Sequence, residues 1–179
     1  MATIALLGTL DTKGDEHAFV AAQIRARGHG TLLIDVGTDQ PPRITPDISR
    51  EEVARIAGIY LAALTTRHDR GECVTAMAGA AAIILAKLHG EGKIDGVISL
   101  GGGGGTAIAT AGMRALPLGF PKLMVSTLAS GSARIPAVAM AVPPPPPREI
   151  TPSIFPSACN FARMITAALA IVATHSPRS

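Results

Sequence analysis

Residues 101–105 are five consecutive glycines, and a threonine follows them. Glycine has no Cβ, so the main-chain N–H groups of such a run can turn toward a phosphate or a carboxylate. A helix that begins after the run adds unpaired N–H groups and the positive end of its dipole. The run therefore predicts an anion site, with a flexible linker or a tight turn without a ligand as the alternatives. The candidate binding residues of this run are Gly101, Gly102, Gly103, Gly104, Gly105 and Thr106.

The spacing within the run does not name the ligand. A dinucleotide-binding fingerprint has a glycine or an alanine at the position that Thr106 occupies. No Gly-Lys-Ser/Thr triplet follows, which excludes a Walker A loop. The pattern indicates binding of a phosphate or a carboxylate, and it leaves open which molecule carries that group.

Two further segments place small and hydroxyl-bearing residues directly after apolar runs, at residues 8–14 and 126–131. The carboxyl ends of the strands in an open parallel sheet share one edge, and ligands bind there. We therefore expect these two segments and the glycine run to converge on one site. The two segments add the candidates Gly8, Thr9, Asp11, Thr12, Lys13, Ser126, Thr127, Ser130 and Gly131.

The charged and hydroxyl side chains among these candidates each have a structural alternative. Lys13 is either a phosphate partner or a solvated loop lysine. Asp11 either holds a metal ion through water or stabilises a turn. Asp35 ends the next apolar run, a position where an acidic residue commonly contacts a ribose hydroxyl. Thr127 and Ser130 either donate to phosphate or substrate oxygens or cap a helix.

No catalytic residue can be assigned from the sequence. The five histidines have no ligand spacing, and we expect most of them at the surface. Cys73 and Cys159 are isolated and indicate reduced core cysteines. Asp69 is expected to do no more than cap a helix. No Ser-His-Asp or Cys-His arrangement can be defended from residue order alone.

The hydrophobic pattern predicts an α/β fold, a Rossmann-like three-layer domain with a mostly parallel sheet. The expected strands are residues 3–7, 31–36, 95–100 and 121–125. The expected helices begin at Thr12, with Asp15 completing a capping box, and at Ser49, with Glu52 doing the same. The first of these helices should run to about residue 27, with Gly28 as its stop. Further helices are expected at residues 60–66, 73–89, 107–113 and 157–172.

Composition limits the function further. The chain has 179 residues, of which 47% are hydrophobic and 3% aromatic, so one domain with an aliphatic core is expected across residues 1–179. Residues 142–148 contain five consecutive prolines and predict an exposed spacer, with an SH3-like ligand as the alternative. The formal charge of +3 and the few aromatics argue against nucleic acid as a partner. No signal peptide or membrane-spanning run is expected, which favours a cytoplasmic protein.

Several of these motifs together resemble one family. The segments 8–14, 35–37, 101–119 and 125–131 are similar to the UPF0261 family of Tm-1-like ATP-binding proteins. The resemblance implies a Rossmann-like amino-terminal domain that binds ATP with Mg²⁺ and forms a homodimer. It also implies a carboxy-terminal domain of comparable size, which is missing from this chain. The similarity weakens at residues 132–160, where the family pattern is lost.

Two other functions remain open at this point. One is an enzyme that acts on a small phosphorylated or carboxylated metabolite. The other is a protein-interaction module without catalysis, in which the nucleotide is structural. The glycine run and the hydroxyl-bearing segments suit all three interpretations, because each of them needs an anion site.

Overall fold

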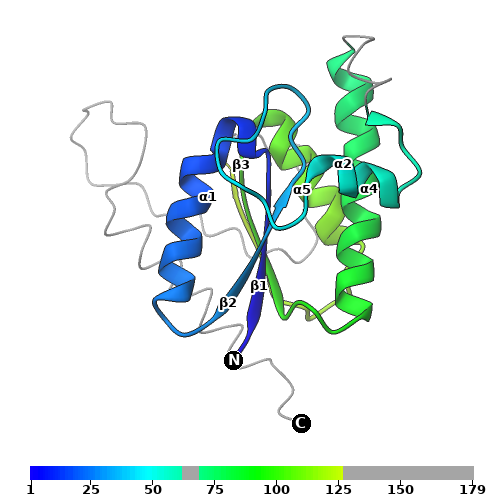
Figure 1. Ribbon diagram of the computed structural model, residues 1–179. Helices are drawn as coiled ribbons and strands as arrows, with labels where there is room; N and C mark the ends of the chain where they lie inside the picture. The colour runs from blue at the N-terminus through cyan, green and yellow to red at the C-terminus, as the bar shows by residue number, and fades with distance from the viewer. Residues whose placement is uncertain (62–68, 127–179) are drawn as a thin grey trace, which may run out of the picture.

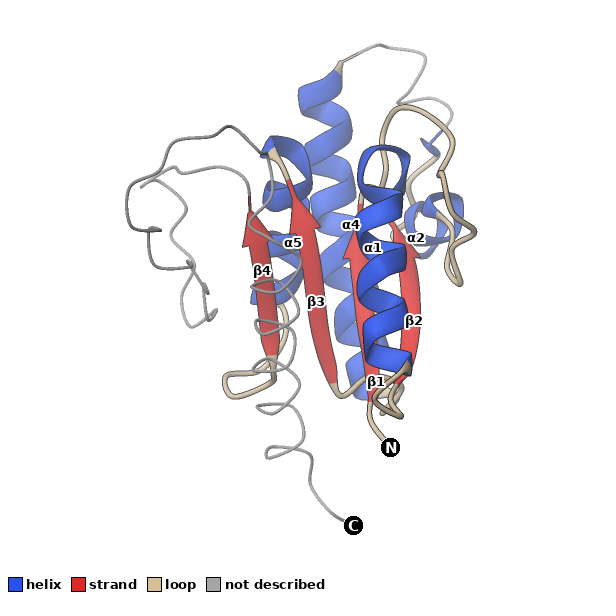
Figure 2. Cartoon of the chain, turned by 90° about the vertical axis from the view of Figure 1, so that its left-hand side faces the viewer, coloured by secondary structure: helices blue, strands red, loops and turns tan. Residues whose placement is uncertain are grey.

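The computed structural model describes residues 1–61 and 69–126. The strands in this part of the chain form one parallel sheet, in the order β2-β1-β3-β4, with helices on both faces (Figure 1). Figure 2 shows the four strand arrows pointing the same way, so their carboxyl ends share one edge. This confirms the predicted three-layer, Rossmann-like α/β domain. The strands are β1 (Thr3–Gly8), β2 (Gly30–Asp35), β3 (Gly96–Gly101) and β4 (Lys122–Ser126).

Different helices cover the two faces of the sheet. Successive side chains of a strand point to opposite faces, and both faces of β1 are buried. Leu6 lies with Val20 and Ile24 of α1, whereas Leu7 lies with Met77 of α4 in a second core cluster. The second cluster also contains residues of α2 and α5. The helices are α1 (Leu10–Arg25), α2 (Arg50–Ile56), α4 (Arg70–Gly90) and α5 (Gly103–Arg114).

Three local signals of the sequence act as predicted. The Ser49 hydroxyl accepts a hydrogen bond from the Glu52 N–H at 3.2 Å and caps α2. The Asp69 carboxylate accepts from the Glu72 N–H at 3.0 Å and caps α4, so this helix begins three residues earlier than expected. Gly28 follows α1 with φ of 78°, a conformation that favours glycine. These signals act within a few residues, which is why the sequence reveals them.

Two further helix starts were predicted wrongly, and both corrections concern the expected loops. α1 begins at Leu10, not at Thr12, and the Thr12 hydroxyl contacts the Thr9 hydroxyl at 3.0 Å instead of capping a helix. The helix is interrupted at Lys13, where φ is −124° and ψ is 21°. The glycine run is also not a loop, because β3 includes Gly101 and α5 begins two residues later. Most residues of both segments therefore belong to the first turn of a helix.

Among the described helices, α4 is long and apolar enough to cross a membrane, judged by length and composition alone. On these two criteria the expectation of no such run was wrong. The same properties suit a helix that packs in a protein core. Its side chains Met77, Ile84 and Leu85 are buried in the cluster that also holds residues of the sheet and α5.

Some predictions fall outside the described residues. They are most of the helix at residues 60–66, the site residues Thr127, Ser130 and Gly131, the proline-rich spacer at 142–148, the helix at 157–172, and Cys159.

Candidate functional site

A cleft of about 600 Å³ lies at the edge where the strands end. The amino-terminal ends of three helices line it, because α1, α4 and α5 all begin at this edge. The lining residues are Thr9, Asp11, Thr12 and Lys13 at α1, Asp69, Arg70, Cys73 and Val74 at α4, Gly102, Gly103, Gly104, Gly105 and Ile108 at α5, and Thr38 and Asp39 after β2. The dipoles of the three helices therefore bring partial positive charge to one place, which favours an anion.

The start of α5 offers main-chain donors to this cleft. The first hydrogen bond inside the helix runs from the Thr106 N–H to the Gly102 carbonyl oxygen at 2.9 Å. The N–H groups of Gly103, Gly104 and Gly105 precede it and have no partner within the helix. Gly102, at the cap position, has no side chain to accept from them. Three consecutive N–H groups are thus available where α5 meets the cleft.

The glycines of this segment serve different purposes. A Cβ on Gly101 would lie 2.8 Å from the Thr106 nitrogen and 3.0 Å from the Gly105 carbonyl carbon, so the backbone itself requires glycine there. A Cβ on Gly104 would meet only Val74 Cγ2, at 3.3 Å. A Cβ on Gly105 would lie 3.3 Å from Thr9 Oγ1. The last contact places the end of β1 beside the start of α5, as the convergence of these two segments requires.

Two of the predicted site residues bind each other. Thr106 Oγ1 lies 2.8 Å from Ser126 Oγ, and this bond joins the first turn of α5 to the end of β4. Thr106 is buried, and neither residue lines the cleft. Gly8 and Gly101 do not line the cleft either. The structure therefore gives these four residues a part in shaping the edge of the sheet.

Two cationic side chains line the cleft. Lys13 lies at its edge and forms an ion pair with Glu16, with 2.8 Å between Nζ and Oε1. Arg70, which the sequence analysis missed, is the first residue of α4 and is exposed. Arg70 could have been predicted from its position directly after Asp69, which caps a helix. The amino end of such a helix lies at the ligand-binding edge of a parallel sheet.

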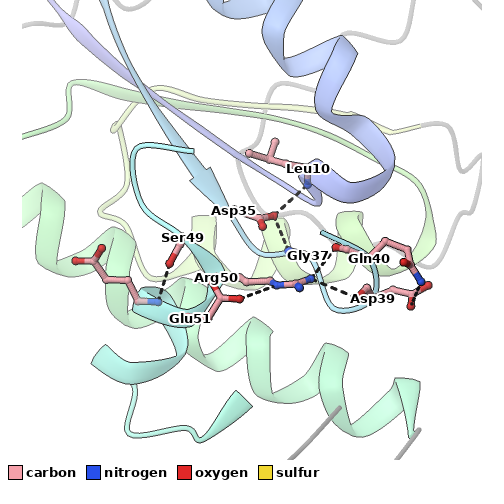
Figure 3. A network of polar contacts seen from close by, with 9 residues as sticks. Leu10, Asp35, Gly37, Asp39, Gln40, Ser49, Arg50 and Glu51 are labelled. Atoms are coloured by element: carbon pink, nitrogen blue, oxygen red, sulfur yellow. Dashed lines mark hydrogen bonds and ion pairs between the residues drawn. The ribbon is translucent and has the colours of Figure 1, made fainter. Parts of the chain in front are cut away.

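Asp35, the last residue of β2, ties together two segments that border the cleft (Figure 3). Its Oδ1 accepts from the Leu10 N–H at 3.1 Å and from the Gly37 N–H at 2.8 Å, which ties the end of β2 to the start of α1. Burial raises the pKa of the Asp35 carboxyl against the effect of these two donors and of Arg50, and the nearby Asp11 adds to the rise. The side chain is 1% exposed and does not line the cleft, and its expected contact with a ribose hydroxyl stays a prediction.

Arg50 fixes the loop that follows β2. Figure 3 shows its guanidinium between Glu51 and the loop: Nε donates to Glu51 Oε1 at 3.0 Å, and Nη1 donates to the Gln40 carbonyl oxygen at 2.8 Å. Asp39, which lines the cleft, precedes Gln40 in this loop. The start of α2 therefore positions one wall of the cleft.

His17 is an exception to the expectation that most histidines lie at the surface, because it is 0% exposed. Its Nδ1 lies 2.7 Å from the Lys13 carbonyl oxygen and its Nε2 lies 3.3 Å from the Leu7 carbonyl oxygen. A carbonyl oxygen only accepts, and a neutral imidazole donates from one nitrogen, so the shorter distance indicates an Nδ1–H donor. The ring thereby connects the interruption in α1 to the end of β1.

The buried imidazole makes the stability of the domain depend on pH. Burial lowers the pKa of His17, although both carbonyl oxygens oppose this effect. The unfolded chain therefore binds more protons than the native state near the ordinary histidine pKa of about 6.5, so stability falls as the pH drops through this value. We expect His17→Gln to reduce this loss, which for one group is at most about 1.4 kcal/mol per pH unit. Urea unfolding at pH 7.5 and 5.5 measures it, and an unchanged difference in the variant contradicts the assignment.

Fold and site together define a Rossmann-like α/β domain with an anion-compatible cleft at the carboxyl edge of its sheet. The chain belongs to the UPF0261 family: the model described as "Uncharacterised protein family (UPF0261) N-terminal domain" matches residues 2–138. This confirms the resemblance inferred from the sequence motifs.

The relatives match most of the chain. A UPF0261 protein of Clostridium tetani and one of Rhizobium meliloti are each 47% identical over 131 residues, which is 73% of this chain and 32% of the relative. The "ToMV susceptible protein tm-1(GCR26)" of Solanum lycopersicum is 31% identical over 140 residues, or 70% of this chain and 19% of that protein. The chain thus spans about a third of the length of these bacterial relatives.

Proposed function

We propose that this domain binds ATP in the cleft, with the phosphates at the amino-terminal end of α5. The observation that carries the proposal is the meeting of three helix amino ends, one of which offers three consecutive glycine N–H groups. Backbone donors at a helix start suit phosphate oxygens without needing a charged side chain. The resemblance to ATP-binding proteins supports the choice of nucleotide.

Side chains from the other two helices complete the phosphate site in this proposal. Lys13 and Arg70 supply positive charge, and the hydroxyls of Thr9 and Thr12 supply donors. Lys13 would exchange its partner Glu16 for a phosphate oxygen, or share the ammonium between them. Thr9 lies beside Gly105, so its hydroxyl and the N–H groups of α5 can reach one ligand.

The lining contains more negative than positive side chains. The lining includes three aspartates, Asp11, Asp39 and Asp69, and two cationic residues, Lys13 and Arg70. Asp69 already accepts the Glu72 N–H, which disperses part of its charge into α4. Because ATP is itself an anion, the proposal requires a counter-charge that accompanies the nucleotide, and Mg²⁺ supplies it in the usual form of ATP.

Thermal unfolding with and without nucleotide tests the proposal. We expect ATP with Mg²⁺ to raise the melting temperature, because a ligand at a hundred times its Kd stabilises the native state by about 2.7 kcal/mol. At about 2–4 °C per kcal/mol, the shift is about 5–10 °C. Adenosine at the same concentration is the control and should shift it much less. No shift with millimolar ATP and Mg²⁺ in a folded sample refutes ATP binding.

Assembly is a separate part of the proposal. The homodimer expected from the resemblance stays a prediction, because a single chain carries no information about it. Ile83 of α4 is 46% exposed, and it is one of several large apolar side chains that the described residues leave at the surface, with Phe19, Tyr60 and Leu118.

A further inference from the structure

Two buried carboxylates, one of which lines the cleft, lack partners for part of their oxygen atoms. Asp11 is 6% exposed and Asp35 is 1% exposed. Asp11 Oδ1 and Asp35 Oδ2 are buried and accept no hydrogen bond. Burial of a polar oxygen without a partner is unfavourable, and more so when the oxygen is charged. Such a group therefore needs an explanation in a native structure.

The two carboxyl groups are neighbours beside Gly37. A Cβ placed on Gly37 would lie 3.3 Å from Asp11 Oδ1, which has no partner, and 3.1 Å from Asp35 Oδ1, which accepts from the Leu10 and Gly37 N–H groups. The Asp35 oxygen without a partner is Oδ2 of the same carboxyl group. Asp11 also lines the cleft, so the pair adjoins the region where the phosphates would lie.

Neither carboxylate is neutralised by a side chain in residues 1–61 and 69–126. Lys13, two residues from Asp11, forms its ion pair with Glu16 at 2.8 Å. Arg50 acts on Asp35 only from a distance, because its guanidinium bonds to Glu51 and to the Gln40 carbonyl. A proton shared between the carboxylates or a bound cation would relieve the pair. The position of Asp11 in the cleft lining, where an anion is expected, favours the cation.

We propose that Asp11 and Asp35 bind a divalent cation of the hard, oxygen-preferring class, such as Mg²⁺ or Mn²⁺, beside the cleft. The described residues contain no group of three or more His, Cys, Asp or Glu side chains that could hold a metal ion. This agrees with Mg²⁺, which commonly takes one or two carboxylates and completes its shell with water and phosphate oxygens. Contact between this cation and phosphate rests on the proposed ATP binding. Binding of the cation by Asp11 and Asp35 does not depend on that proposal.

Binding of Mn²⁺ to the nucleotide-free protein tests the site directly. Free Mn²⁺ has a strong electron paramagnetic resonance signal, so titration of the protein with Mn²⁺ alone gives the number of bound ions and their affinity. We expect one site per chain. We expect Asp11→Asn to weaken it by at least about tenfold, because it removes a charged ligand and keeps the shape of the side chain. Mg²⁺ should displace the bound Mn²⁺.

Asp39→Asn is the matched control, because Asp39 lines the same cleft but is exposed and lies in the loop held by Arg50. It should leave Mn²⁺ affinity within about twofold, since general charge attraction at the surface is screened by salt. Thermal unfolding of both variants checks that they fold. The titration of the wild-type protein needs no variant, so it shows whether the protein binds Mn²⁺ even if Asp11→Asn is unstable.

The outcomes separate this proposal from ATP binding. Loss of Mn²⁺ affinity in Asp11→Asn but not in Asp39→Asn supports the cation site. No Mn²⁺ bound by the wild-type protein, or equal losses in both variants, overturns it. If the protein then still binds ATP in the presence of EDTA, the proposed function stands without the cation. In that case a carboxyl proton shared by the pair, visible by carbon-13 NMR at pH 7, explains the two oxygens.

Discussion

We expect Gly104→Val to weaken ATP binding by at least about a hundredfold, or about 2.7 kcal/mol, while the domain stays folded. Gly104 is the second residue of α5 and lines the cleft. Its φ is not positive, and a Cβ there would meet only Val74 Cγ2 at 3.3 Å. The helix therefore accepts a side chain at this position. A valine side chain would nevertheless occupy the space in front of the N–H groups that the proposal assigns to phosphate.

Gly101→Ala should behave in the opposite way. The added Cβ would lie 2.8 Å from the Thr106 nitrogen and 3.0 Å from the Gly105 carbonyl carbon, which are backbone atoms of the first turn of α5. They cannot shift without disturbing the start of the helix. We expect a loss of about 1–3 kcal/mol in the free energy of unfolding, as for other overpacked positions. Gly79→Ala is the control, because nothing lies within 4 Å of its Cβ position, and alanine should stabilise α4 by up to about 1 kcal/mol.

Calorimetric titration with ATP and thermal unfolding of the same samples separate binding from stability. Lys13→Ala should reduce affinity less than Gly104→Val, because it removes one partly solvated charge and leaves the backbone donors. If the glycines serve only a tight turn, Gly104→Val should lose stability in proportion to affinity. If a folded Gly104→Val protein keeps its full affinity for ATP, the amino-terminal end of α5 does not bind the phosphates.

The second large effect is expected at Gly8, the last residue of β1. A Cβ on Gly8 would overlap Nε2 and Cε1 of the His17 ring, and His17 is 0% exposed, so the ring has no room to move. We expect Gly8→Ala to lower the free energy of unfolding by about 3 kcal/mol, the upper end for overpacking. The melting temperature should fall by about 6–12 °C. The turn that carries Thr9 and Asp11 to the cleft follows directly, so affinity for ATP should fall as well.

A double mutant identifies His17 as the cause. His17→Ala alone should be destabilising, because it leaves a cavity and two carbonyl oxygens without the ring. Combined with Gly8→Ala, the two losses should not add, because the first substitution removes the ring that the second would strike. A coupling free energy of at least about 1 kcal/mol is expected from urea unfolding of the four proteins. If the two losses in stability add, a side chain at residue 8 does not strike the His17 ring.

The order of strands and helices could be read from the sequence, because its signals are short in range. Strand segments buried on both faces are continuous apolar runs, and the caps Ser49 and Asp69 act on an N–H three residues later. The boundaries at the cleft were less accurate. Thr12 has the spacing of a capping residue, but its hydroxyl contacts Thr9, because the helix has already begun at Leu10.

The amino-acid sequence by itself determined the family, the α/β class, and the presence of an anion-compatible glycine segment after a strand. Only the tertiary structure decided which residues share the cleft. Arg70 joins Gly104 there because α4 and α5 begin at the same edge, whereas Asp35 does not line the cleft and its Oδ1 accepts from the N–H groups of Leu10 and Gly37. The burial of His17 also depends on the tertiary structure, because its ring occupies space that a side chain at residue 8 would fill. Such facts depend on contacts between residues distant in the chain, and a local pattern carries no information about them.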